Sequence, residues 1–150
     1  LNIGKLDEYT VVMADIDHFK NINDTHGHNV GDDVIRNVAR ILEACVKVND
    51  VVARYGGEEF CIVFPTSDLK HAKYISENMR KKIELNHFGD IMVTCSFGIS
   101  SIKFGAKSPK ELLDQADTAL YKSKANGRNK ITVWDVNLEE NDVNMAANNQ

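Results

Sequence analysis

The spacing of apolar residues divides the chain into short strands and amphipathic helices. Residues 11–14 form an apolar run that ends in acid, a pattern typical of a buried central strand. Apolar positions recur every three or four residues over 31–46 and again over 69–83, which predicts two helices, the second capped by Asp68. The polar residues 18–29 lie between the strand and the first helix and predict an ordered loop or a broken helical turn.

A Gly-Gly pair at 56–57 separates two runs that are typical of strands. Residues 51–55 precede the pair and the apolar segment 60–64 follows it, so the two runs are expected to form a β-hairpin, because both glycines can take positive φ. Residues 91–102 are rich in Val, Thr, Cys and Ile and predict a further strand. A short edge strand is expected over 131–134.

The last helix has the clearest boundaries. Ser108 can cap it, Pro109 suits its first turn, and Glu111 stands at the capping-box position. The apolar period continues to about residue 125, and Gly127 is expected to end the helix.

The order strand, helix, hairpin, helix, strand, helix indicates an α+β domain of the ferredoxin-like type, with a central antiparallel sheet and helices packed on its faces. In this split βαβ arrangement the first strand lies beside the second arm of the hairpin and runs antiparallel to it. Asp15, at the carboxyl end of the first strand, is then expected beside the hairpin turn that carries Glu58 and Glu59. Carboxylates distant in the sequence thus converge at one end of the sheet.

Crowded carboxylates repel one another unless a cation neutralises them. Asp15, Asp17, Glu58 and Glu59 are predicted to form such a cluster. Their hard oxygen atoms suit Mg²⁺ or Mn²⁺, and a phosphate-bearing substrate would complete the metal's ligand shell. The alternative is that these acids are solvated residues at strand ends, as most such acids are.

Composition narrows the class of protein. At 150 residues the chain is expected to hold one domain over 1–136, followed by a disordered, Asn-rich tail over 137–150. A net charge of −4 argues against nucleic-acid binding, and the lack of a run of about 18 apolar residues argues against a membrane contact from this segment. Cys45, Cys61 and Cys95 are expected to be reduced thiols of a cytoplasmic protein. The chain begins with Leu, so we interpret it as an N-terminally truncated piece of a longer protein, which could be membrane-anchored elsewhere.

Residues 54–60 read Arg-Tyr-Gly-Gly-Glu-Glu-Phe and resemble the signature of the GGDEF family in its GGEEF form. Three further segments resemble motifs of that family in the same order: a first-strand motif over 15–24, a nucleotide loop over 27–32, and a last-helix motif over 116–129. The set covers about residues 11–134. A lone Gly-Gly-Glu-Glu-Phe would be a weak signal, but the ordered set is specific.

The resemblance implies a nucleotidyl-cyclase (palm-like) fold and diguanylate cyclase activity. Two GTP molecules would be condensed into cyclic di-GMP with release of two pyrophosphates, with Mg²⁺ or Mn²⁺ as the cofactor. One domain holds one GTP, so the implied enzyme works as a two-fold homodimer with its active site between the subunits. The resemblance also implies an output domain of a larger bacterial-type signalling protein.

The family's metal ligands map onto the side chains of Asp15 and Glu58 and onto the carbonyl of Ile16. Glu58 or Glu59 would help deprotonate the attacking 3′-hydroxyl. Lys20 could take up the charge that develops at the α-phosphate.

The resemblance also assigns residues to the nucleotide. Asn23 and Asp32 would read the guanine edge, because a carboxylate can accept from guanine's N1–H and exocyclic amine, and His28 would touch the substrate. The triphosphate would be held by three cations, Lys20, Lys124 and Arg128. Plainer roles exist, since Asn23 also suits a turn and cations in the last turn of a helix favour its dipole.

Two features depart from the family pattern. Residues 1–10 are too short to supply the helix and the Leu-Thr-containing segment that usually precede the first strand. Lys47 and Asp50 stand at the ends of the segment where many members carry an inhibitory Arg-x-x-Asp motif. Lysine keeps the charge but lacks the planar fork that stacks on guanine, so product inhibition is expected to be weak.

Two rival functions remain. One is a catalytically silent GTP-binding regulatory module, and the intact Glu58-Glu59 pair argues against it. The other is a different nucleotidyl cyclase or a polymerase-palm enzyme. Asn23 and Asp32, as guanine readers, favour GTP over ATP.

Overall fold

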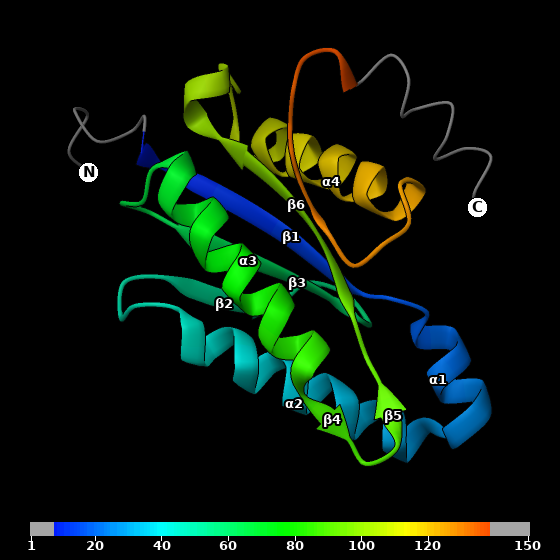
Figure 1. The fold of residues 1–150 in the computed structure, drawn as a ribbon. Coiled ribbons are helices and arrows are strands. Elements are labelled where there is room, and N and C mark those ends of the chain that lie inside the picture. The colour runs from blue at the N-terminus through cyan, green and yellow to red at the C-terminus, as the bar shows by residue number, and fades with distance from the viewer. Residues whose placement is uncertain (1–7, 139–150) are drawn as a thin grey trace.

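A five-stranded sheet forms the centre of the computed structural model, which describes residues 8–138 (Figure 1). The strands lie in the order β2-β3-β1-β6-β7. Their bounds are β1 Thr10–Ile16, β2 Val51–Arg54, β3 Glu59–Phe64, β6 Cys95–Ser101 and β7 Ile131–Val133. β1 pairs antiparallel with both β3 and β6, and β2 pairs antiparallel with β3. The prediction that the first strand lies beside the second arm of the hairpin, β3, is confirmed. The sheet was predicted to be antiparallel, but it is mixed, because β7 pairs with β6 in parallel.

Helices cover both faces of the sheet, which confirms the α+β class. Their bounds are α1 Phe19–His26, α2 His28–Cys45, α3 Leu69–Leu85 and α4 Pro109–Ala125. α2 and α3 lie on one face and α4 lies on the other (Figure 1). A hairpin of β4 (His87–Phe88) and β5 (Ile91–Met92) precedes β6, and a 3-10 turn, η2 (Ile102–Phe104), follows it. Asp68 and Ser108 cap α3 and α4 as predicted, through side-chain oxygens that accept backbone N–H groups.

β1 is buried along its whole length, and its alternating side chains build two cores. Val12 and Ala14 belong to the larger core, which α2 and α3 complete, whereas Val11 and Met13 belong to the smaller core under α4. Burial of each large aliphatic side chain stabilises the fold by about 1.5–3 kcal/mol. The packing on both faces fixes β1, and with it the position of Asp15 near its carboxyl end.

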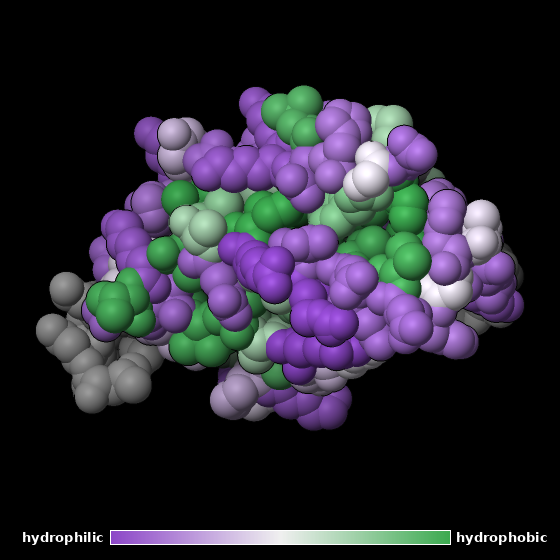
Figure 2. Space-filling model, turned by 90° about the horizontal axis from the view of Figure 1, so that it is seen from below, coloured by the Kyte–Doolittle hydropathy of each residue, from purple (hydrophilic) through white to green (hydrophobic). Residues whose placement is uncertain are grey.

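α2 is amphipathic, as its three-and-four spacing predicts. Val38 and Leu42 are fully buried toward the sheet, whereas Arg36 and Arg40 are exposed. Figure 2 shows the molecule from below, which is the side on which α2 lies in Figure 1. Most of this surface is hydrophilic, and apolar residues are visible between the hydrophilic ones. The helix therefore separates the larger core from solvent.

α4 packs unusually close to β6 at Gly98. A Cβ placed on this glycine would lie 2.2 Å from the carbonyl oxygen of Ala116 and 2.2 Å from the nitrogen of Leu120, both backbone atoms of the helix. The hydroxyl of Ser123 donates to the carbonyl of Phe97 at 2.7 Å, one residue away on the same strand. Glycine is therefore needed here for helix and strand to touch.

Two local predictions were only partly right. Residues 18–29 are mostly helical, because Phe19 packs on the core and Ile22 is buried, which stabilises the short helix α1. Gly27, with φ 90°, separates α1 from α2. The strand predicted over 91–102 is interrupted between β5 and β6, where the carbonyl of Thr94 accepts the N–H of Asp17 at 2.9 Å.

The described residues also bear on the expectations from composition. None of their helices is long and apolar enough to cross a membrane. The three cysteines are free, and burial raises the pKa of the Cys95 thiol well above its usual value. Residues 139–150, most of the tail that was predicted to be disordered, lie outside the described residues, as do residues 1–7.

Candidate active site

The C-terminal end of β1, the β2–β3 turn, α1 and the C-terminal end of α4 lie at the same end of the domain (Figure 1). In the β1–β3 ladder Asp15 is opposite Glu59. The N–H of Ile16 donates to the carbonyl of Glu58 at 3.2 Å. The strand order thus brings together Asp15, Glu58 and Glu59, as the split βαβ arrangement predicted.

The β2–β3 turn is held by its own flanking residues. Nε of Arg54 donates to the carbonyls of Gly56 and Gly57 at 3.2 and 3.0 Å, and the N–H of Tyr55 donates to the carbonyl of Glu59 at 2.8 Å. Neither glycine has positive φ, so our reason for predicting this turn was wrong although the hairpin exists. A Cβ on Gly57 would meet nothing within 4 Å. The missing side chains leave the turn open to a ligand beside Glu58.

Asp15 is the most buried acid of the cluster, with its side chain 6% exposed. Burial raises its pKa from 3.8 to about 6, against the opposing effect of a hydrogen bond from Lys124. Glu58 and Glu59 add repulsion that raises it further. A carboxylate in this position needs a cation, and Nζ of Lys124 supplies one by pairing with Oδ2 of Asp15.

Glu59 faces α4 rather than the turn. It lines a cavity of about 190 Å³ together with Asp117, Tyr55 and Tyr121. Burial raises the pKa of Glu59, and Asp117 and Glu58 raise it further. Burial also raises the pKa of Asp117. The sequence analysis gave Asp117 no role, although it stands in the last-helix motif one α-helical turn before Tyr121.

Asp17 does not lie in the acidic cluster, so the prediction of four clustered acids is wrong for this residue. Its carboxylate accepts hydrogen bonds from the hydroxyls of Thr94 and Ser96 at 2.7 and 2.6 Å. It also accepts the backbone N–H of Asn129 at 3.0 Å. These three donors satisfy a carboxylate that is 5% exposed without any metal, and they tie the end of β1 to β6 and to the loop after α4.

The nucleotide loop of the sequence analysis is the junction of α1 and α2. Oδ1 of Asn23 is buried, and it has no hydrogen-bond partner among the residues that the structure describes. It lies 1.8 Å from the position that a Cβ on Gly31 would occupy, so the side chain of Asn23 depends on a glycine there. His28, the first residue of α2, and Asp32 are exposed beside it, and Lys20 is exposed on α1.

Two of the three cations that were predicted to hold the triphosphate, Lys124 and Arg128, lie at the end of α4. Lys124 stands in the last turn of the helix, and Arg128 is exposed in the loop that follows. Arg128 has left-handed φ of 65°, and its N–H donates to the carbonyl of Ser123 at 2.9 Å. Of these two cations, Lys124 reaches the acidic cluster, through its pair with Asp15.

A family model described as "Diguanylate cyclase, GGDEF domain" matches residues 4–130. The chain belongs to the GGDEF family. Diguanylate cyclase A of Treponema denticola is 44% identical over 138 residues, which cover 89% of this chain and 37% of that protein. The probable diguanylate cyclase DgcT of Escherichia coli is 42% identical over 135 residues, which cover 85% of this chain and 30% of that protein. This GGDEF chain thus spans only 30 to 37% of the length of these two relatives.

Solved GGDEF domains have the same fold. The active GGEEF domain of a diguanylate cyclase from Vibrio cholerae has a TM-score of 0.82 and 30% identity, covering 86% of this chain and 84% of that chain. The GGDEF domain of DgcB from Caulobacter crescentus, in complex with c-di-GMP, has a TM-score of 0.76 and 36% identity, covering 83% and 77%. The nucleotidyl-cyclase (palm-like) fold implied by the motifs is confirmed.

Residues 47–50, the segment that was compared with an inhibitory motif, form the loop between α2 and β2. The carboxylate of Asp50 accepts the backbone N–H of Lys47 at 2.8 Å, and the N–H of Asp50 donates back to the carbonyl of Lys47 at 3.0 Å. The side chain of Lys47 is exposed. The two hydrogen bonds between Asp50 and the main chain of residue 47 therefore set the shape of this loop. They do not depend on which cationic side chain stands at position 47.

The acidic end of this GGDEF domain offers oxygen atoms that fit a divalent cation. Among the described residues, no group of three or more His, Cys, Asp and Glu side chains is placed to hold a metal ion. Asp15 precedes Ile16, the last residue of β1, and the N–H of Ile16 donates to the carbonyl of Glu58, the residue before β3. The carboxylates of Asp15 and Glu58 and the carbonyl of Ile16 therefore come from adjoining segments. Hard oxygen ligands of this kind suit Mg²⁺, which usually takes only one or two carboxylates and completes its shell with phosphates and water.

Proposed function

We propose that this GGDEF domain condenses two GTP molecules into cyclic di-GMP and releases two pyrophosphates. The observation that carries the proposal is the placement of Asp15. It is buried at the carboxyl end of β1 beside Glu58 and Glu59, and it has a pKa raised to about 6. Such a carboxyl is stabilised in its ionised form by a cation, and a metal–nucleotide complex supplies one.

Asp15, Glu58 and the carbonyl of Ile16 would hold Mg²⁺ or Mn²⁺. The bound metal would offset negative charge on the triphosphate during in-line attack by the 3′-hydroxyl. Lys124 pairs with Asp15 in the structure. With a metal–nucleotide complex bound, Lys124 would contact the phosphates and Asp15 would hold the metal in place of its pair with Lys124.

Asn23 and Asp32 bind the guanine, with His28 beside them. The buried and unpartnered Oδ1 of Asn23 supports this role, because a guanine N–H would satisfy it. Lys20 and Arg128 hold the triphosphate together with Lys124.

Glu59 is the better placed of the two glutamates to accept a proton from the 3′-hydroxyl. Burial and the nearby Asp117 raise its pKa, and a raised pKa makes a carboxylate a stronger base. Glu58 is then left to hold the metal. This division of roles rests on the position of Glu59 beside Asp117 and Tyr121 of α4.

The reaction requires a pair of domains, because one domain binds one GTP and the 3′-hydroxyl of each nucleotide must meet the α-phosphate of the other. We place this pair in a longer signalling protein, in keeping with the length of the relatives. We place it in the cytoplasm, where reduced thiols such as the three free cysteines are stable.

The test is to incubate the chain with GTP and Mg²⁺ and to separate the products by chromatography. Cyclic di-GMP should form, and its rate per domain should rise with protein concentration. The matched control is Glu58→Gln, which removes one metal-side charge and should lower the rate by about 10²-fold or more while the fold persists. GTP binding without turnover would instead indicate a silent regulatory module, and turnover of ATP would indicate a different cyclase.

A further inference from the structure

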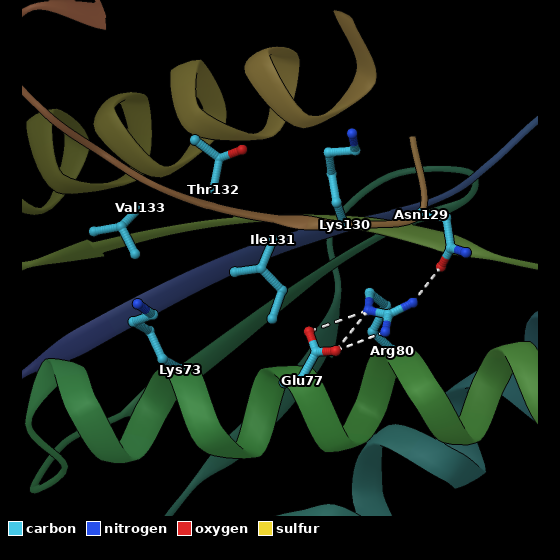
Figure 3. Close-up of a pocket in the computed structure, with 8 residues that line it drawn as sticks. All are labelled: Lys73, Glu77, Arg80, Asn129, Lys130, Ile131, Thr132 and Val133. Atoms are coloured by element: carbon cyan, nitrogen blue, oxygen red, sulfur yellow. Dashed lines mark hydrogen bonds and ion pairs between the residues drawn. The ribbon is translucent and has the colours of Figure 1, made fainter. Parts of the chain in front are cut away.

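A groove of about 780 Å³ runs between α3 and the segment that leads from α4 into β7. Arg80 of α3 and Asn129 of that segment meet across it (Figure 3). Neither residue lies in the acidic cluster. The contact matters because Asn129 directly follows Arg128.

The guanidinium of Arg80 is held in one orientation by acids of its own helix. Its Nε donates to both carboxylate oxygens of Glu77 at 3.1 Å, and its Nη2 donates to Glu77 at 2.6 Å. Its Nη1 lies 3.5 Å from the carboxylate of Glu84. The side chain is 15% exposed, so solvent screens these pairs less than it screens surface pairs.

The same Nη1 of Arg80 donates to Oδ1 of Asn129 at 2.9 Å, a contact between residues 49 positions apart. The amide nitrogen of Asn129 donates to Glu84, so both ends of this amide are bound by α3. The main-chain N–H of Asn129 donates to Asp17, at the end of β1. Asn129 is thus held both by α3 and by Asp17, the residue that follows β1.

This fixation is needed because the loop has an unfavourable backbone conformation. Arg128 and Asn129 have φ of 65° and 49°, and consecutive left-handed residues other than glycine are held only by their surroundings. Without the contacts to Asn129, the loop would relax to other conformations, and the side chain of Arg128 would leave its present position.

We infer that Arg80 is a positioning residue that, through Asn129, holds Arg128 in place for the triphosphate. The inference rests on the proposed function, in which Arg128 binds phosphate. Arg80 is not assigned a contact with the nucleotide, because four of its five N–H groups are already directed at Glu77, Glu84 and Asn129. Its effect is therefore specific to the phosphates and does not extend to the guanine.

The experiment compares binding of a non-hydrolysable GTP analogue and of GMP, by calorimetry with Mg²⁺, on the full 150-residue chain. Arg80→Gln should weaken binding of the GTP analogue about tenfold, as expected when a charge-assisted hydrogen bond is lost, and change GMP binding less than about twofold. Arg128→Ala should do the same. The double variant should lose little more than either single variant, because both act through one contact.

The matched control is Arg40→Gln on α2, where Arg40 also reaches an i−3 side chain, donating to Asn37 at 3.2 Å on an exposed surface. It should leave both affinities unchanged. Asn129→Ala is a second variant that keeps the pairs of Arg80 with Glu77 and Glu84, and it should reproduce the loss if Arg80→Gln does not fold.

Three outcomes separate the two proposals. If Arg128→Ala leaves binding of the GTP analogue intact, the proposed phosphate role of Arg128 is wrong. If Arg128→Ala weakens it but Arg80→Gln and Asn129→Ala do not, only the inference about Arg80 is overturned. Equal losses for GMP and the GTP analogue, or additive losses in the double variant, would show that Arg80 serves general stability.

Discussion

Replacing Asp15 by Asn should make the metal-free domain more stable while it removes activity. Asn has nearly the same shape and cannot ionise, so it removes only the cost of a buried charge. A pKa raised from 3.8 to about 6 corresponds to a cost of up to about 3 kcal/mol when the carboxyl is fully ionised. That figure already includes the attraction to Lys124, which opposes the effect of burial.

The pH dependence has a definite sign. Between pH 3.8 and about 6 the folded chain binds more protons at Asp15 than the unfolded chain does, so its stability falls as pH rises through this window. The advantage of Asp15→Asn over the wild type should therefore be complete at pH 8, about half as large at pH 5, and small at pH 4. Denaturant unfolding at these pH values, in the presence of a chelator, measures the difference.

Added Mg²⁺ and GTP should stabilise the wild type and not Asp15→Asn, because the variant has lost a metal ligand. Asp33→Asn is the control, since Asp33 pairs with Arg36 on the surface with its side chain 69% exposed, and its effect should stay within about 0.5 kcal/mol. A variant that is less stable than the wild type at pH 8 without metal would refute the reasoning. It would mean that the ion pair of Asp15 with Lys124 stabilises the fold by more than the burial of the Asp15 carboxylate costs.

Three further changes test other parts of the site. Asp32→Ala should weaken GTP binding or relax it toward ATP, and unchanged affinity and selectivity in calorimetry would contradict a role in reading guanine. Gly31→Ala should weaken GTP binding although alanine favours helices, because the new Cβ displaces Asn23, and normal binding would show that Asn23 is not a guanine ligand. Lys47→Arg should increase inhibition by cyclic di-GMP about tenfold to a hundredfold in initial-rate assays, because Asp50 keeps the loop in shape, whereas no gain would mean that no inhibitory pocket exists here.

The sequence predicts the scaffold of the site because that scaffold follows from local periodicity and strand order. The apolar run of β1, the hairpin and the capped α4 are all short-range patterns. Once they are placed in a split βαβ order, the meeting of Asp15 with Glu58 and Glu59 follows. The fold class and the acidic cluster were therefore accessible without coordinates.

The missed features depend on side-chain contacts between distant segments. Asp17 was grouped with the metal acids because it stands two residues after Asp15, and its donors Thr94 and Ser96 lie 77 and 79 residues away. The contact of Arg80 with Asn129 has no local signal at either end. Whether such polar groups meet depends on how α3 and the loop after α4 are oriented on the sheet, which periodicity does not determine.

The contact of β6 with α4 at Gly98 limits how this domain can be regulated. Helix backbone touches strand backbone there, so α4 cannot slide or roll on the sheet without a steric clash. The backbone of Lys124, carried on that helix, therefore keeps its position relative to β1, whether its side chain contacts Asp15 or a phosphate. If two such domains act as a pair in a longer protein, as proposed, regulation would then change how often and in which orientation the two domains meet. The rate of product formation would depend on how the two domains are brought together, and the length and stiffness of the linkers that carry them would set how strongly it responds.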